Sequence, residues 1–207
     1  PNRRYHPSQV ILTDNPGWEN ADSQQRERIV EAAQRYILDY EPDLSKDWIE
    51  SNSHPYSMLA GYAAIRLLFD RRPSSLEKLG SGIWKRWVSS CINPPISNDS
   101  KDSRQEILRL AGQHAPAEIA EALKLLIEKY NREHEKLLDA TTLDACWSEE
   151  LAQMIKKLLT DSALSPSVTG KLVGKLLKHN DPEAKELAKK FSPTRQPRRN
   201  REWEISI

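Results

Sequence analysis

Apolar residues recur at helical spacing along most of the chain. Between residues 22 and 40, the apolar positions fall on one face of a helix: Ile29, Val30, Ala33, Ile37 and Tyr40. Charged residues occupy the opposite face, as on a helix that covers a core. Residues 55–70 are apolar nearly all round, which predicts the most deeply buried helix. Gly61 lies inside this stretch and predicts the close approach of a neighbouring helix, because glycine has no side chain.

The same periodicity predicts helices through the rest of the chain. One helical stretch begins at Pro73, and we expect Gly80 and Gly82 to divide it. Further helices are predicted over residues 104–113, 116–130 with a kinked continuation to 138, 148–159, 166–178 and 182–191. Short connections favour antiparallel helical hairpins. The predicted fold class is therefore all-α, with hairpins stacked as an irregular array.

Composition along the chain predicts five segments. They are an irregular lead-in at 1–20, N-terminal helical hairpins at 21–92, a polar loop or linker at 93–103, C-terminal hairpins at 104–191, and a basic linker with a possible strand at 192–207. In the last segment, Trp203, Ile205 and Ile207 alternate with polar residues, which is the period of a strand. This ending, together with a first residue that is not Met, leads us to interpret the chain as part of a larger protein.

Charge and cysteine content narrow the classes of partner. The 31 basic and 30 acidic residues nearly balance, so the whole chain has no strong field to attract nucleic acid or a membrane. No apolar run has the length of a membrane span. Cys91 and Cys146 have no short-spaced cysteine partner, which predicts buried free thiols and a reducing, cytoplasmic location.

Motifs for catalysis or for cofactor and metal binding are lacking. The five histidines are scattered over separate predicted elements: His6, His54, His114, His134 and His179. None has a partner at metal-ligand spacing. Gly170-Lys171 and Gly174-Lys175 do not match a phosphate-binding loop, and we interpret their Gly-x-x-x-Gly spacing as a close helix crossing. We predict no catalytic residue, cofactor or metal, and we expect a protein that is not an enzyme.

Two basic stretches are candidates for partner binding. In the first, two tryptophans three positions apart flank two cations: Trp84, Lys85, Arg86 and Trp87. Aromatic and arginine side chains often anchor interfaces, and aromatic rings also stack on bases. Burial of both tryptophans in the core is the competing interpretation. The second stretch is a tail of four arginines: Arg195, Arg198, Arg199 and Arg201.

Residues 165–191 resemble one HEAT-like repeat. An apolar helix ends at Leu176-Leu177-Lys178-His179-Asn180 and is followed by Asp181-Pro182-Glu183-Ala184-Lys185 and a second apolar helix. The resemblance implies an α-solenoid in which Asp181 and Lys185 link successive repeats, although Ala184 replaces a larger aliphatic residue. The whole segment is also similar to the helical-repeat region of large bacterial signal-transducing NTPases.

Three functions remain open at this point. We favour a noncatalytic helical scaffold that binds a protein partner or other domains of the same chain, because stacked helices offer extended surfaces. A nucleic-acid-binding helical array is the second hypothesis. The third is a sensor or regulatory region of a signal-transducing NTPase whose nucleotide-binding domain lies outside this segment.

Overall fold

In the computed structural model, residues 11–42, 49, 55–92, 94 and 99–191 are described, and every regular element among them is a helix. The first half contains η2 (Leu12–Asp14), α1 (Pro16–Glu19), α2 (Ser23–Asp39), α4 (Tyr56–Arg71), α5 (Pro73–Glu77) and α6 (Ser81–Ile92). The second half contains α7 (Lys101–His114), α8 (Pro116–His134), α9 (Ala140–Ala145), α10 (Glu149–Asp161), α11 (Pro166–Lys178) and α12 (Ala184–Phe191). The predicted all-α class is confirmed.

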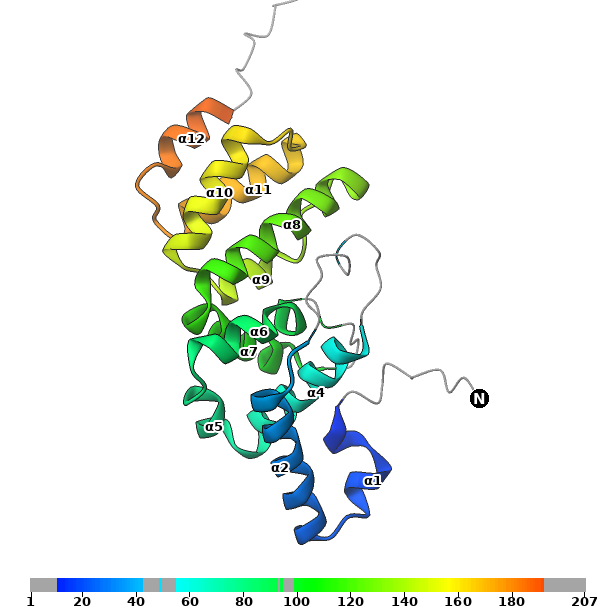
Figure 1. Cartoon of the computed structure of the whole chain (residues 1–207). Coiled ribbons are helices and arrows are strands. Elements are labelled where there is room, and N and C mark those ends of the chain that lie inside the picture. Colours follow the sequence, from blue (N-terminus) through cyan, green and yellow to red (C-terminus); the bar gives the residue numbers. More distant parts are fainter. Residues whose placement is uncertain (1–10, 43–48, 50–54, 93, 95–98, 192–207) are drawn as a thin grey trace, which may run out of the picture.

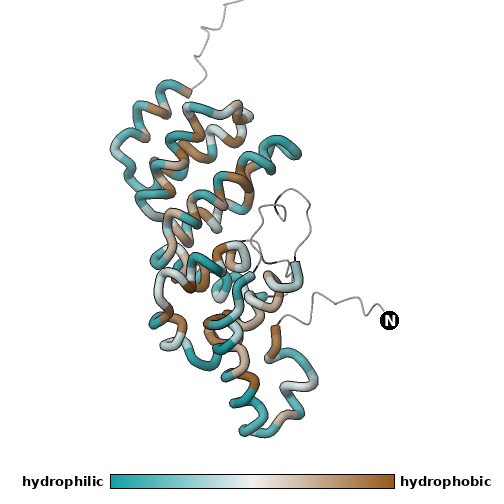
Figure 2. Tube along the Cα trace, in the orientation of Figure 1, coloured by the Kyte–Doolittle hydropathy of each residue, from teal (hydrophilic) through white to brown (hydrophobic). Residues whose placement is uncertain are grey.

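The helices follow one another along the length of the molecule. Figure 1 shows α1 and α2 at one end and α12 at the other. In between, α2 packs on α4, α4 on α6, α6 on α7 and α8, α8 on α10, and α11 on α12. Hydrophobic and hydrophilic residues alternate along the helices (Figure 2), as expected where each helix turns one face toward its neighbours.

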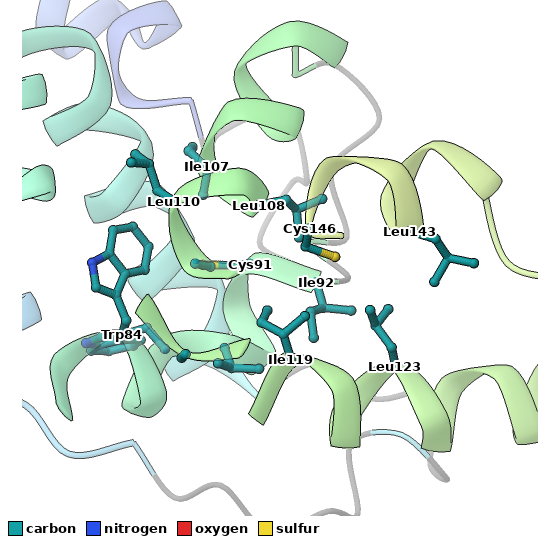
Figure 3. Packing of buried hydrophobic residues seen from close by; sticks show 14 of the residues in the cluster. Trp84, Cys91, Ile92, Ile107, Leu108, Leu110, Ile119, Leu123, Leu143 and Cys146 are labelled. Atoms are coloured by element: carbon teal, nitrogen blue, oxygen red, sulfur yellow. The ribbon is translucent and has the colours of Figure 1, made fainter. Parts of the chain in front are cut away.

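A single cluster of buried hydrophobic side chains extends from Trp18 to Ala184. It continues across residues 93–103 because α6 packs against both α7 and α8. Figure 3 shows this junction, where side chains of α6 meet those of the next two helices: Trp84, Cys91, Ile92, Ile107, Leu108, Ile119 and Leu123. The two predicted groups of hairpins therefore share one core.

Capping residues explain where several helices begin and end differently from the prediction. The Ser100 hydroxyl accepts a 3.2 Å hydrogen bond from Ser103 N, so α7 begins at Lys101 and not at residue 104. Helix α8 ends at His134, where Glu135 adopts a left-handed conformation with φ of 52°. The predicted continuation to residue 138 is therefore wrong. The expected division of residues 73–92 is confirmed by the break between α5 and α6.

Three further predictions concern the start of the last helix and two segments that lie mostly outside the described residues. Helix α12 begins at Ala184, two residues later than expected. The sequence also favours a short helical turn at 44–49; of this stretch only Ile49 is described, and it is helical and buried. The tail at 192–207, with its possible strand, lies outside the described residues.

The glycines divide into those that touch a neighbour and those that do not. A Cβ added to Gly61 would lie 2.1 Å from Cζ3 of Trp87 on α6, so the predicted close approach at Gly61 is confirmed. A Cβ added to Gly170 or Gly174 would meet nothing within 4 Å. The predicted helix crossing at these two positions is wrong, because the face of α11 that carries them is exposed.

Candidate functional site

Trp84 and Trp87 lie in the core, each with 1% of its surface exposed. The indole Nε1 of Trp87 donates a 3.0 Å hydrogen bond to the carbonyl oxygen of Ile37 on α2. Trp84 stacks on His114 of α7, with ring centroids 5.8 Å apart. Both indoles thus join neighbouring helices, in agreement with the packing interpretation. Neither presents a ring face to a partner or a base, so their assignment as surface binding residues is corrected.

The two cations between these tryptophans bind within the molecule. Lys85 Nζ lies 2.7 Å from Glu118 Oε1 on α8. The Arg86 guanidinium donates hydrogen bonds of 3.0 and 3.2 Å to the carbonyl oxygens of Leu38 and Tyr40, at the C-terminal end of α2. These four residues consequently do not form one surface. The four arginines of the tail, Arg195, Arg198, Arg199 and Arg201, lie outside the described residues.

A groove lies instead between α7, α9 and the end of α11. Its wide part has a volume of about 500 Å³ and is lined by Asp102, Gln105, Glu106, Arg109, Thr141, Asp144, Ala145 and Lys178. A narrow recess of about 30 Å³ adjoins it and is lined by Lys101, Arg104, Gln105, Leu108, Asp139, Thr141 and Thr142. Because Gln105 and Thr141 line both parts, we treat them as one site, the α7–α9 groove.

Local interactions set the wall of the groove that α9 forms. Asp139 caps α9 by accepting hydrogen bonds from Thr141 N at 3.0 Å and Thr141 Oγ1 at 2.8 Å. At the other end, a Cβ on Gly112 would lie 2.8 Å from Cβ of Cys146. The absence of a side chain at Gly112 therefore lets the end of α9 pack directly on α7.

Asp144 ties α9 to the end of α11. Its Oδ2 lies 2.7 Å from Nζ of both Lys175 and Lys178, and its Oδ1 lies 3.0 Å from Nε2 of His179. The His179 ring stacks on Trp147 with centroids 3.9 Å apart. Partial burial raises the pKa of Asp144, but hydrogen bonds from these three basic residues outweigh it and hold the pKa well below its ordinary 3.8. Asp144 is thus a carboxylate over the physiological pH range.

The other charges of the groove differ in whether they are paired. Arg109 donates two hydrogen bonds to Glu106, of 2.8 and 2.5 Å, which lower the pKa of Glu106. Within the described part of the chain, Lys101 and Arg104 form no ion pair within 4.0 Å. Thr141 lowers the pKa of Asp139 most, and the charges of Lys101 and Arg104 lower it further. The narrow recess therefore contains two cations and one carboxylate, that of Asp139, which forms no close ion pair with either cation but interacts with both charges.

Neither cysteine thiol has a pKa near neutrality. Burial raises the pKa of the Cys91 thiol to about 12, and the pKa of Cys146 also to about 12. Both cysteines are free and buried, as predicted. No group of three His, Cys, Asp or Glu side chains among the described residues could hold a metal ion.

Asp181 connects the turn before α12 to α10 through Lys156. Its carboxylate lies 3.3 Å from Nζ of Lys156 on α10 and accepts a 2.9 Å hydrogen bond from Glu183 N. Lys156 also pairs with Glu183 at 2.9 Å. Lys185, by contrast, is exposed on α12. Among the described residues the basic partner of Asp181 is thus Lys156, which precedes it in the chain, and the linking role of Lys185 stays a prediction.

Comparison of the chain with protein-family models, with curated proteins and with solved structures gave no match. The candidate site therefore depends on the geometry of this chain alone. Among the described helices, none has both the length and the apolar character needed to cross a membrane.

The pH dependence of the Asp144 cluster gives a first prediction. Because the folded pKa lies below 3.8, this cluster stabilises the fold above about pH 4 and its contribution is lost as the pH falls further. We expect Asp144→Asn to lower the free energy of unfolding by about 1–2 kcal/mol at pH 7, and the difference from wild type to shrink between pH 4 and pH 2. Urea denaturation across this range measures it, with Glu31→Gln on the exposed face of α2 as control. If the difference in free energy of unfolding between Asp144→Asn and wild type were constant with pH, the ionised Asp144 would not be the source of the stabilisation.

Proposed function

We propose that this chain is a noncatalytic helical scaffold that recognises a protein partner, and that the α7–α9 groove is the recognition surface. The observation that carries the proposal is the groove itself. It combines amide, hydroxyl, carboxylate and basic side chains from three helices that are far apart in the sequence. Protein–protein interfaces contain direct hydrogen bonds, and the polar groups of the groove can supply them to a bound segment.

The ion pairs of the α7–α9 groove support recognition, because they order the charged side chains of the groove before a partner binds. Arg109 is held by Glu106, and Lys178 is held by Asp144. Side chains that are already ordered lose less entropy on binding, which favours affinity. The same ion pairs disfavour proton transfer, since a general acid or base works best with a pKa near the ambient pH, whereas the pKa of Asp144 is far below it.

The finer family assignment forms part of the proposal. An irregular HEAT-like array is supported by the succession of helices along the molecule and by the contact of Asp181 with Lys156 of the preceding helix. In a regulatory region of a signal-transducing NTPase, the segment bound in the groove would belong to another domain of the same protein. Two buried free thiols are compatible with the cytoplasmic location that we propose.

A photo-crosslinking residue in the groove tests this function. We would replace Gln105, which lines both parts of the groove, with p-benzoylphenylalanine and irradiate the protein in extract from its source cells. We expect a discrete protein adduct that mass spectrometry identifies. The matched control carries the same residue at Glu31, which is exposed on α2, and should not give this adduct. Adducts of nucleic acid alone, or equal labelling from both positions, would contradict the proposal.

A further inference from the structure

The narrow recess of the α7–α9 groove differs from the wide part in its free charges. In the wide part, Glu106 and Asp144 are neutralised by Arg109 and by Lys175 and Lys178. In the recess, both oxygens of Asp139 accept hydrogen bonds from Thr141. No carboxylate among the described residues lies within ion-pairing distance of Lys101 or Arg104. An anionic group in the recess would meet an ammonium, a guanidinium and the amide of Gln105, against the single carboxylate of Asp139.

The charge of the recess distinguishes among anionic groups. Asp139 lines the recess together with Lys101 and Arg104. A phosphorylated side chain would bring a charge of about −2 next to this carboxylate, whereas an aspartate or glutamate side chain brings a single charge. The recess therefore suits an aspartate or glutamate side chain better than a phosphorylated one.

The carboxylates around the recess disfavour a continuous polyanion. Four of them line the groove: Asp102, Glu106, Asp139 and Asp144. A nucleic-acid backbone that followed the groove would place phosphates beside these groups, and like charges at close range repel. Among the described residues, no aromatic side chain lines either part of the groove, so these residues offer bases no ring to stack on. A polypeptide with one acidic side chain brings a single negative charge near these carboxylates and needs no ring to stack on.

We propose that the partner is a protein segment that inserts one acidic side chain between Lys101 and Arg104, while its neighbouring residues follow the wide part of the groove. This inference rests on the proposed function and adds the chemistry that selects the partner. The two cations form charge-assisted hydrogen bonds to the carboxylate. Arg104 and Gln105 belong to the same turns of α7, so the helix holds the donors at fixed spacing.

A peptide library of random sequence tests the inference. Twelve-residue displayed peptides would be selected on the wild-type chain and then measured by fluorescence anisotropy. We expect the selected peptides to share one Asp or Glu. Replacing that residue with Gln or Asn should weaken binding about tenfold or more, as for the loss of a hydrogen bond to a charged group. The double variant Lys101→Gln, Arg104→Gln should weaken binding of the acidic peptide to the same extent. It should leave binding of the Gln or Asn version of the peptide unchanged.

A matched control removes two lysines elsewhere. Lys157 on α10 and Lys171 on α11 are exposed and do not line the groove, so Lys157→Gln, Lys171→Gln should bind the acidic peptide like wild type. Circular dichroism checks that both double variants remain folded. Equal loss in the control variant would overturn the inference, because it would indicate attraction to the overall charge.

Further competitors separate the remaining possibilities. Tighter binding of a phosphoserine version of the selected peptide, or its displacement by 10 mM inorganic phosphate or by single-stranded DNA, would overturn the choice of a carboxylate. If the selected peptides crosslink to p-benzoylphenylalanine placed at position 105 but share no acidic residue, the inference fails while the proposed function stands. If no peptide is selected and p-benzoylphenylalanine in place of Gln105 captures no protein, the inference and the proposed function both fail.

Discussion

Replacing Gly61 with alanine is expected to destabilise the protein by about 3 kcal/mol, because overfilling a packed core forces side chains and backbone to move. The new Cβ would lie 2.1 and 2.3 Å from two ring atoms of Trp87. The ring has little freedom to yield, because only 1% of Trp87 is exposed and its Nε1 is hydrogen-bonded to the carbonyl oxygen of Ile37. Relief of the clash would therefore separate α4 from α6.

Urea denaturation followed by circular dichroism measures this loss. The chain offers a close control in Gly174, which also lies inside a helix but would bring no added Cβ within 4 Å of a neighbour. Gly174→Ala should stabilise the protein by up to about 1 kcal/mol through helix propensity. Equal stability of Gly61→Ala and wild type would show that α4 and α6 are not packed through this glycine.

Replacing Asp99 with alanine is expected to cost about 3 kcal/mol or more, because it leaves part of a buried arginine without its partner. The Asp99 side chain has no exposed surface and accepts a 2.9 Å hydrogen bond from Arg66 Nε on α4. It also accepts a hydrogen bond from the hydroxyl of Tyr62. Asp70 still pairs with Arg66 in the variant, which limits the loss.

Thermal and urea denaturation of Asp99→Ala distinguish a structural connection from a free linker. A linker residue would tolerate alanine with a change within about 0.5 kcal/mol. Asp39→Ala gives the control, since Asp39 is exposed at the end of α2 and should show only such a small change. A loss below about 1 kcal/mol for Asp99→Ala would contradict the burial of its ion pair.

Helices were predictable from the sequence because periodicity depends on local spacing. Val30, Ala33 and Ile37 are buried as their spacing predicts. Tertiary contacts were less predictable. Gly61 and Gly174 give the same local signal, a glycine inside an apolar helix, yet only Gly61 faces another helix closely. Which glycine meets a neighbour depends on the path of the chain between helices, and local spacing does not encode that path.

The candidate site was missed for a related reason. Helix α9 is short and contains Thr141 and Thr142, whose β-branched side chains have low helix propensity. Without α9, no local pattern places Asp144 near Lys175 and His179. Polar composition was also misleading at residues 93–103, where Asp99 is buried because Arg66 and Tyr62 satisfy its oxygens. A buried charge is acceptable once it is paired.

Hydrogen exchange of the complex tests the α7–α9 groove as the recognition surface most directly. Backbone amides would be followed with and without the partner captured at Gln105. Our account predicts slower exchange on binding at residues 101–109 and 139–145, which form the walls of the groove, and unchanged exchange at residues 23–39 of α2. Protection confined to α2, or spread evenly over the chain, would contradict it.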